Sequence, residues 1–210
     1  SLVGSEMCIR DRSLVIIFYK NSQNTSLYTY LSEHVLPAVY KRMEIPMVSV
    51  WKQAEEICSV SSDLKEMYTQ LEWALLFEEG KLIRVSEIEL KKESIQNGIE
   101  KYPMELEELA KKAMLIKDKE QLKYCYRQLP QYYQNNPQSP MTIKKDIIRF
   151  FWALAKVGGL EIDGKEPDIQ EKLNQISGAV CWLQIQKIVE QTIQTVSYTH
   201  LRAHETSAHL

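Results

Sequence analysis

The first half of the chain alternates short apolar runs with segments whose apolar residues recur at helical spacing. The run SLVIIFY (residues 13–19) is rich in β-branched and aromatic residues, and a polar stretch closes it, a pattern typical of a buried strand. From Leu27 to Met43 the apolar spacing predicts a helix, which Pro37 kinks or restarts. A strand followed by a helix therefore opens the predicted fold.

The same alternation continues to residue 85. Residues 47–51 (MVSVW) are predicted to form a second strand. Asp63 and Glu66 have the spacing of a capping box, which predicts the start of a helix that Gly80 ends. Residues 81–85 (KLIRV) are predicted to form a third strand. These elements make an α/β layer in which each helix buries one face on a sheet.

The second half of the chain has a helical pattern throughout. Helices are predicted over residues 104–118, 119–134, 141–159, 168–177 and 180–194. Pro103 can occupy the first turn of the first helix, and Pro130 is expected to shorten or bend the second. The predicted fold class is α+β, with a small α/β sandwich over residues 13–100 followed by an all-helical bundle over residues 101–194.

The two ends of the chain are related to each other as DNA. Codons can be chosen for Ser1 to Asp11 such that the complementary strand, read backwards, encodes Val196 to Thr206 at every position. The inverted repeat resembles a transposase-type sequencing-library adapter. Residues 1–12 and 195–210 are therefore predicted to be adapter-derived and not biological, and they do not enter the fold prediction.

Most of the histidines lie in the second of these end segments. His200, His204 and His209 have a spacing that suits a zinc site on a helix, and it is equally typical of a disordered polar tail. Because the tail is predicted to be adapter-derived, no metal site is predicted there. His34 falls on a predicted amphipathic helix and is expected to be a packed or solvated helix residue, not a catalytic base.

Charge and cysteine content exclude several classes of protein. The chain has 26 Lys+Arg against 28 Asp+Glu and a net charge of −2, so it offers no basic field to hold nucleic acid. Cys58, Cys125 and Cys181 are widely spaced and favour ordinary buried thiols in a reduced, cytoplasmic chain. No apolar run is long enough to span a bilayer, so this segment is expected to make no membrane contact.

Acidic residues and glycines offer motifs that have simpler structural explanations. Glu105, Glu107 and Glu108 could form an acid/base or metal cluster, but they fall in a first helical turn, where capping and solubility explain them. Residues 161–168 (EIDGKEPD) lack the alternation of a calcium loop and are expected to form a polar connection. The glycines at 158–159 follow a helix and are predicted to cap its end, not to cradle phosphate.

The aromatic residues of the second half could be a platform for stacking bases, but no basic groove accompanies them. They are expected to form the core and rim of the helical bundle: Tyr124, Tyr126, Tyr132, Tyr133, Phe150, Phe151, Trp152 and Trp182. No catalytic, cofactor-binding or metal-binding residue is predicted, and the chain is not expected to be an enzyme.

The order of elements in residues 13–85 resembles the C-terminal part of the GGDEF-type nucleotide cyclase fold. The run SLVIIFY, the following helix, the strand in PMVSVWK and the segment SSDLKEMYTQLEWALLFEEGKLIRV match that fold in order and spacing. The segment ALLFEEGKLIRV lacks the Ala-Lys and Gly-Arg-Asn pattern that active cyclases usually carry after this helix. The resemblance therefore implies a degenerate, regulatory GGDEF-like region over residues 13–100.

A second resemblance covers nearly all of residues 13–194. The segments DLKEMYTQLEWALLFEEGKLI, YPMELEELAKKAMLIKDKEQL, IIRFFWAL and ISGAVCWLQIQKIVEQTI are similar to the central region of AraC-type two-component response regulators. In that family such a region joins a receiver domain, or a membrane-bound sensor, to a C-terminal pair of helix-turn-helix motifs. The resemblance implies a non-catalytic, signal-transmitting linker that self-associates and contacts receiver and DNA-binding domains missing from this chain; only the full-length protein would bind DNA.

Two alternatives to this interpretation stay open. A C-terminal fragment of a GGDEF-type diguanylate cyclase would have its signature motif upstream of Ser13. A freestanding helical interaction module would end soon after Gln194.

Overall fold

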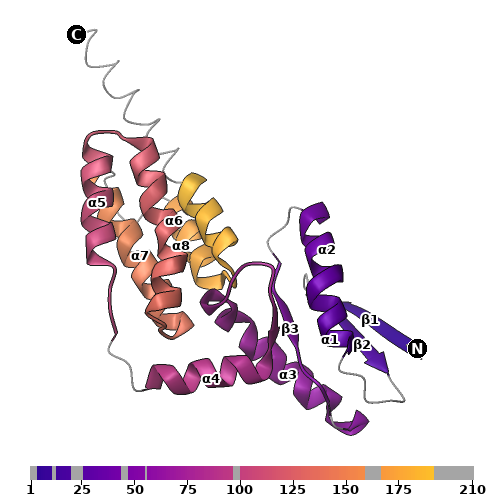
Figure 1. Cartoon of the computed structure of the whole chain (residues 1–210). Helices are drawn as coiled ribbons and strands as arrows, with labels where there is room; N and C mark the ends of the chain where they lie inside the picture. Colours follow the sequence, from indigo (N-terminus) through magenta and orange to yellow (C-terminus); the bar gives the residue numbers. More distant parts are fainter. Residues whose placement is uncertain are drawn as a thin grey trace, which may run out of the picture.

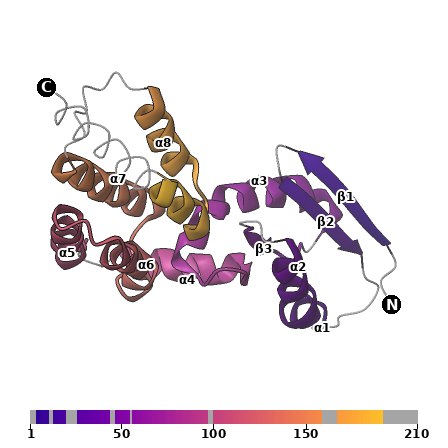
Figure 2. The same cartoon turned by 90° about the horizontal axis from the view of Figure 1, so that it is seen from above.

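The computed structural model describes residues 4–10, 13–19, 26–43, 47–54, 56–96, 100–158 and 167–191. These residues are mostly helical and contain two small sheets, so the predicted α+β class is confirmed (Figure 1). Figure 2 shows the helices of the second half gathered beside the strands and helices of the first half.

The elements before residue 100 are β1 (Gly4–Arg10), β2 (Ser13–Tyr19), α1 (Ser26–Tyr30), the π-helix η1 (Leu31–Val35), α2 (Leu36–Met43), β3 (Ser49–Trp51), the 3-10 helix η2 (Ile57–Ser59), α3 (Val60–Gln70), the 3-10 helix η3 (Leu71–Leu76), β4 (Leu82–Arg84) and α4 (Val85–Gln96). The later elements are α5 (Met104–Leu115), α6 (Lys119–Asn135), α7 (Pro140–Val157), α8 (Pro167–Gly178) and a last helix over 182–191.

The strands form two separate pairs instead of one layer. β1 and β2 form an antiparallel hairpin, and β3 and β4 form a parallel pair. The predicted strand over residues 13–19 is confirmed as β2, but the expectation that it is buried beside the later strands is wrong, because it pairs with β1 and Ile16 is 47% exposed. β1 belongs to the segment predicted to be adapter-derived. The described residues therefore show no α/β sandwich.

The parallel pair β3–β4 has contacts on both faces. On one face, the Tyr28 ring of α1 lies 6.1 Å from the Trp51 ring, and the Arg84 guanidinium carbon lies 3.8 Å from the Tyr28 ring centre. On the other face, Val50 and Ile83 pack into the hydrophobic core. Alternate residues of a strand point to opposite faces. These short strands therefore place some of their side chains against α1 and the others against the core.

Pro37 interrupts the first long helix as its missing N–H requires. The Leu36 amide bonds to the Leu31 carbonyl, five residues back, which is the hydrogen bond of a π-helix. Widening the turn just before a proline removes the clash of its ring with the preceding turn. The predicted interruption is confirmed, because the α-helix restarts at Leu36.

The predicted capping box of Asp63 and Glu66 is wrong, since α3 begins at Val60, ahead of both residues. Lys52, just after β3, binds both carboxylates: its Nζ lies 2.8 Å from Asp63 Oδ1 and also pairs with Glu66. The acidic pair therefore ties α3 to the end of β3. The helix also ends earlier than predicted, because α3 tightens into η3 and stops at Leu76, four residues before Gly80.

The sequence pattern predicts no element where the structure has α4. Ile88 is fully buried and Ile95 packs against the core, but Leu90 on the same helix is 67% exposed. Apolar residues therefore do not gather on one side of α4, and the helical periodicity that a prediction needs is weak.

The helices of the bundle begin and end largely as predicted. Asp118 accepts a hydrogen bond from the Gln121 amide at the start of α6, and Ser139 accepts one from the Thr142 amide at the start of α7. Gly158 caps α7. The expectation that Pro130 shortens α6 is wrong, because the helix continues through it to Asn135.

The corner between α5 and α6 is closed by a residue with positive φ. Lys117 has φ 58°, and it follows the last turn of α5. The Asp118 amide bonds to the Ala113 carbonyl at 2.9 Å, and the Lys117 amide bonds to the Met114 carbonyl at 3.2 Å. This is the Schellman arrangement, in which glycine is the preferred residue at the left-handed position.

One hydrophobic core runs across residue 100. It includes Leu75, Leu76 and Ile83 from the first half together with most of the buried side chains of the bundle. The parallel pair and the bundle therefore exclude water from a common set of side chains. Within the described part of the chain, every helix is too short or too polar to cross a membrane.

Candidate functional site

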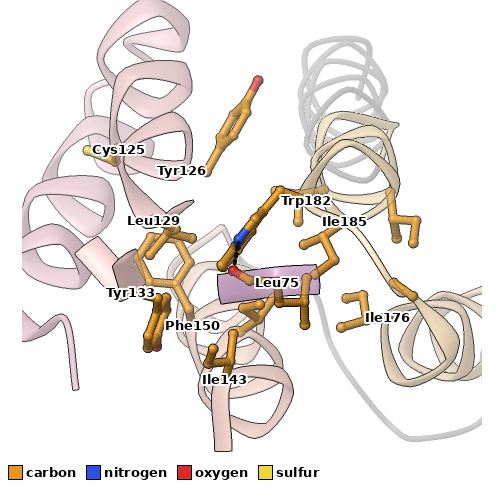
Figure 3. Close-up of a cluster of buried hydrophobic side chains, with 14 of the residues drawn as sticks. Leu75, Cys125, Tyr126, Leu129, Tyr133, Ile143, Phe150, Ile176, Trp182 and Ile185 are labelled. Atoms are coloured by element: carbon orange, nitrogen blue, oxygen red, sulfur yellow. Dashed lines mark hydrogen bonds between the residues drawn. The ribbon is translucent and has the colours of Figure 1, made fainter. Parts of the chain in front are cut away.

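The candidate functional site is the junction at which η3 enters the helical bundle. A 3-10 helix of this length is unusual, because its hydrogen bonds are poorer than those of an α-helix. Here packing compensates, since Leu75 and Leu76 are almost completely buried. Figure 3 shows Leu75 surrounded by side chains from α6, α7, α8 and the last helix. A segment of the first half is thus part of the interior of the second.

Trp182 joins η3 to the last helix. Its indole Nε1 donates a hydrogen bond of 2.7 Å to the Leu75 carbonyl, which lies 107 positions earlier in the chain (Figure 3). The last carbonyls of a helix lack partners within it, so a donor from elsewhere is needed when they are buried. The Tyr133 ring of α6 stacks on Trp182 at 5.8 Å, and the Tyr133 hydroxyl donates to Asp146 of α7 at 3.0 Å. The indole is therefore fixed from two sides.

Lys144 makes a second link between the bundle and η3. Although it is a lysine of α7, its side chain is almost fully buried. Its Nζ donates to the Ser177 carbonyl at the end of α8 at 2.7 Å and lies 3.3 Å from Glu72 Oε2 of η3. A cation at a helix C-terminus is favourable, because the free carbonyls there carry partial negative charge. Lys144 therefore connects α7, α8 and η3.

The turn between η3 and β4 makes a third link. Glu79 accepts a hydrogen bond of 2.6 Å from the Leu183 amide in the last helix and one of 2.5 Å from the Tyr40 hydroxyl in α2. Burial and the bond to Glu79 raise the pKa of Tyr40, so its hydroxyl keeps its proton and remains a donor. Glu79 therefore contacts elements from both halves of the chain.

Cys181 directly precedes Trp182 and is almost completely buried, as is Cys125, whereas Cys58 is exposed. All three thiols are free, as predicted, but the prediction of burial is wrong for Cys58. Burial raises the pKa of the Cys181 thiol to about 11, so it is not a ready nucleophile at neutral pH. A cavity lined by Cys181, Phe77 and Gly80 has a volume of about 10 Å³, room for one water molecule and not for a substrate.

A separate polar cluster holds the start of the bundle together. Glu107 of α5 is only 4% exposed. Its carboxylate accepts a hydrogen bond from the Tyr102 hydroxyl and lies 2.5 Å from Lys111 Nζ. The guanidinium carbon of Arg149 in α7 lies 3.9 Å from the Tyr102 ring centre. The prediction that capping and solubility explain Glu107 is therefore wrong: this carboxylate is buried and bonded to residues on both sides.

The electrostatics of this cluster keep its groups in their ordinary charge states. Burial alone would raise the pKa of Glu107, but hydrogen bonds from Lys111 and Tyr102 outweigh it, and the pKa is lowered. Burial, together with the bond to Glu107, raises the pKa of Tyr102. Neither group is poised to exchange a proton near neutral pH, as a general acid or base must be.

The other predicted site residues are either exposed or lie outside the described residues. His34 lies exposed in η1 with its ring 5.5 Å from that of Tyr30, and Glu105 and Glu108 are exposed on α5, as the solubility explanation expects. Residues 159–166, which contain Gly159 and most of the EIDGKEPD segment, lie outside the described residues, as does the tail with its three histidines. Within the described ranges, no group of three or more His, Cys, Asp and Glu side chains could hold a metal ion.

The aromatic residues are mostly core, as predicted. Buried members are Tyr126, Tyr133, Phe150, Phe151 and Trp182, half-buried members are Tyr132 and Trp152, and Tyr124 is exposed. Sequence reasoning identified Trp182 as core but not as the partner of Leu75. It also missed Glu79 and Lys144. The one available signal was that Lys144 lies on the same side of α7 as Pro140 and Ile147, because a buried cation in a helix needs a partner.

The site can hold elements of both halves of the chain together. Three links from η3 and the following turn reach α2, α7, α8 and the last helix through polar bonds with defined directions. Compared with protein-family models, curated proteins and solved structures, the chain matches none of them.

Proposed function

We propose that this chain is the signal-transmitting middle region of a DNA-binding transcriptional response regulator of the AraC type, with no catalytic activity of its own. In the whole protein a receiver domain precedes it and paired helix-turn-helix motifs follow it. The whole protein acts in the cytoplasm, binds DNA through its C-terminal domain and self-associates.

The observation that carries this proposal is the hydrogen bond from Trp182 to the Leu75 carbonyl inside a shared core. A displacement of η3 cannot leave Trp182 in place without breaking a buried bond, which costs about 1–3 kcal/mol. Packed interiors respond to such displacements by moving whole elements between discrete arrangements. The last helix, which leads toward the C-terminal end of the chain, therefore follows movements that start in the first half.

The proposed mechanism is a population shift. A signal in the missing N-terminal domain favours one of two arrangements of η3 against the bundle, and the last helix carries the difference to the DNA-binding motifs. Two such chains, held side by side, would then change the spacing of two DNA-binding heads, which must match the spacing of half-sites. No residue of this segment touches DNA, in keeping with the net charge of −2.

The finer part of the proposal is that residues 13–100 are a degenerate GGDEF-type α/β region. Support comes from the parallel β3–β4 pair, which has α1 on one face and the core on the other. The absence of the usual cyclase pattern in ALLFEEGKLIRV and the small size of the junction cavity favour a role in transmission. In this proposal, movements of residues 13–100 change the arrangement of the helices in the bundle.

The first test uses the gene from which the chain derives. Genomic sequence on both sides of residues 13–194 is expected to encode a receiver domain upstream and helix-turn-helix pairs downstream. In the full-length regulator, Trp182→Phe should preserve DNA binding but remove its dependence on receiver phosphorylation, whereas the matched change Trp152→Phe should leave the response intact. A Trp182→Phe regulator that responds like the wild type would exclude the proposed route.

The second test uses the chain itself. Fluorescence anisotropy with duplex DNA at low and high salt is expected to show no binding, and incubation with GTP and Mg²⁺ is expected to give no product. Binding that weakens with salt would contradict the proposal, since DNA contact belongs to another domain. A GGDEF motif upstream, or turnover of GTP, would favour a diguanylate cyclase fragment, and a stop codon soon after residue 194 would favour a freestanding interaction module.

A further inference from the structure

The last helix starts without an ordinary cap from its own sequence. Its first intrahelical bond runs from the Ile185 amide to the Cys181 carbonyl at 3.4 Å, which makes Cys181 the N-cap residue. The first amides of a helix have no intrahelical acceptor, and Ser, Thr, Asp or Asn at the N-cap usually supplies one. A cysteine thiol is a weak acceptor. The amides of this first turn therefore have no strong acceptor from the N-cap residue itself.

Glu79 supplies that acceptor from 104 positions away. Its Oε1 accepts a hydrogen bond of 2.6 Å from the Leu183 amide, the second residue of the helix, where an N-cap side chain normally binds. Its negative charge also suits the positive end of the helix dipole. On the other side, the Gln184 side chain accepts from the Val180 amide at 2.9 Å. The Cys181 thiol also faces the Leu183 and Gln184 amides, but only as a weak acceptor, so Glu79 supplies the strong acceptor of this cap.

The other oxygen of the same carboxylate belongs to α2. Glu79 Oε2 accepts a hydrogen bond of 2.5 Å from the Tyr40 hydroxyl. Gly80, next to it, has φ +77°, and a Cβ there would lie 3.5 Å from the Tyr40 ring. The positive φ is the reason for glycine at this turn, since the Cβ distance is an ordinary van der Waals contact. The position of Tyr40 consequently fixes where the carboxylate lies.

We propose that Glu79 is a helix cap donated by the first half of the chain, and that α2 controls the start of the last helix through it. The inference rests on the proposed function in one respect: the last helix is the route by which the signal leaves. Glu79 is exposed, so water can replace its partners and each bond is of modest strength. Elements that switch are drawn from such weakly held regions. A shift of α2 then draws the carboxylate away, and the first turn of the last helix frays.

The test is hydrogen exchange of single amides, measured by NMR on the whole chain. Glu79→Ala should speed exchange of the Leu183 amide about fivefold, the factor expected for a lost N-cap. Tyr40→Phe, which keeps the ring but removes the hydroxyl, should speed the same amide by a smaller factor. Glu78→Ala is the matched control, because it removes the same charge from the neighbouring exposed position, and it should have no effect on Leu183.

A rescue variant separates a cap from a general loss of stability. Cys181→Ser places an ordinary N-cap residue at the start of the helix, so in the Glu79→Ala background it should restore slow exchange at Leu183. In the Cys181→Ser background, Tyr40→Phe should no longer affect Leu183. If Tyr40→Phe instead speeds exchange equally at Leu183 and at core amides such as Ile147, it acts on global stability and the inference is wrong.

Failure of this inference is distinguishable from failure of the proposed function. Unchanged exchange at Leu183 in Glu79→Ala would overturn the cap, while Trp182 could still transmit the signal through η3. If DNA binding by the Trp182→Phe regulator still depends on phosphorylation as in the wild type, the proposed route is wrong, while Glu79 could still cap the helix.

Discussion

Trp182→Phe tests how strongly the two halves of the chain depend on each other. The substitution keeps an aromatic ring to stack on Tyr133 but removes the donor to the Leu75 carbonyl, which lies on a residue with no exposed surface. Leaving a buried carbonyl unsatisfied costs about 2 kcal/mol. The smaller ring also leaves a void, which costs about 1 kcal/mol on the scale of large-to-small core changes. The expected loss of stability is therefore about 3 kcal/mol.

Thermal unfolding followed by circular dichroism measures this loss. For a chain of this size, 3 kcal/mol corresponds to a fall in Tm of about 9 °C. Trp152→Phe is the matched control, because Trp152 in α7 is only half-buried and its indole makes no hydrogen bond to any described residue. It should lower Tm by less than about 3 °C.

Amide hydrogen exchange shows which elements lose stability. If the junction couples the halves, Trp182→Phe weakens protection of Ile83 in β4 and of Ile147 in α7 by similar factors, because both belong to one core. A drop in Tm no larger than that of Trp152→Phe would refute the energetic reasoning. Weakened protection of the bundle alone, with β4 unchanged, would refute the coupling.

Three further substitutions test other parts of the fold. Lys117→Gly should stabilise the chain by about 0.5–1 kcal/mol in urea unfolding, because glycine relieves the left-handed backbone, whereas Lys112→Gly inside α5 should cost about 1 kcal/mol. The pKa of Glu107 is lowered from its usual 4.5 in the folded chain, so the ionised carboxylate stabilises the fold fully above pH 4.5, and this stabilisation is lost as the pH falls through the folded pKa. In Glu107→Gln the free energy of unfolding should therefore depend less on pH in acid than in the wild type. Lys144→Met should cost about 1 kcal/mol, measured in urea, and the exposed neighbour Lys145→Met less than about 0.5 kcal/mol.

The helices of the bundle could be predicted because their signals are local. Ser139 before α7 and Asp118 before α6 each accept a hydrogen bond from the amide three residues later. Apolar spacing alone located the buried side of α7, where Ile143 and Ile147 have almost no exposed surface. Caps and periodicity involve residues a few positions apart, so a single sequence contains them.

The partners of distant elements could not be predicted in the same way. The run SLVIIFY indicates a strand, but nothing within it specifies whether β1 or β3 pairs with it. Asp63 and Glu66 have capping spacing, yet Lys52 binds both, because a cation brought near by the fold outweighs a local preference. Glu107 likewise lies in a first helical turn, but Tyr102 and the packing of α7 bury it. In each case tertiary contacts decided the outcome.

Two of the three links at the junction, those of Trp182 and Glu79, differ in strength, and the difference suits transmission. The bond from Trp182 to Leu75 is buried and stacked, so breaking it costs more than thermal motion supplies. The bonds of Glu79 to Tyr40 and Leu183 are exposed, so water competes for each of them. A movement of α2 would therefore break the Glu79 bonds and fray the first turn of the last helix before it disturbs the core. The bond from Trp182 to Leu75 would stay formed during this change. This order requires that Tyr40→Phe speed hydrogen exchange of the Leu183 amide without lowering Tm. Trp182→Phe should both speed exchange of that amide and lower Tm.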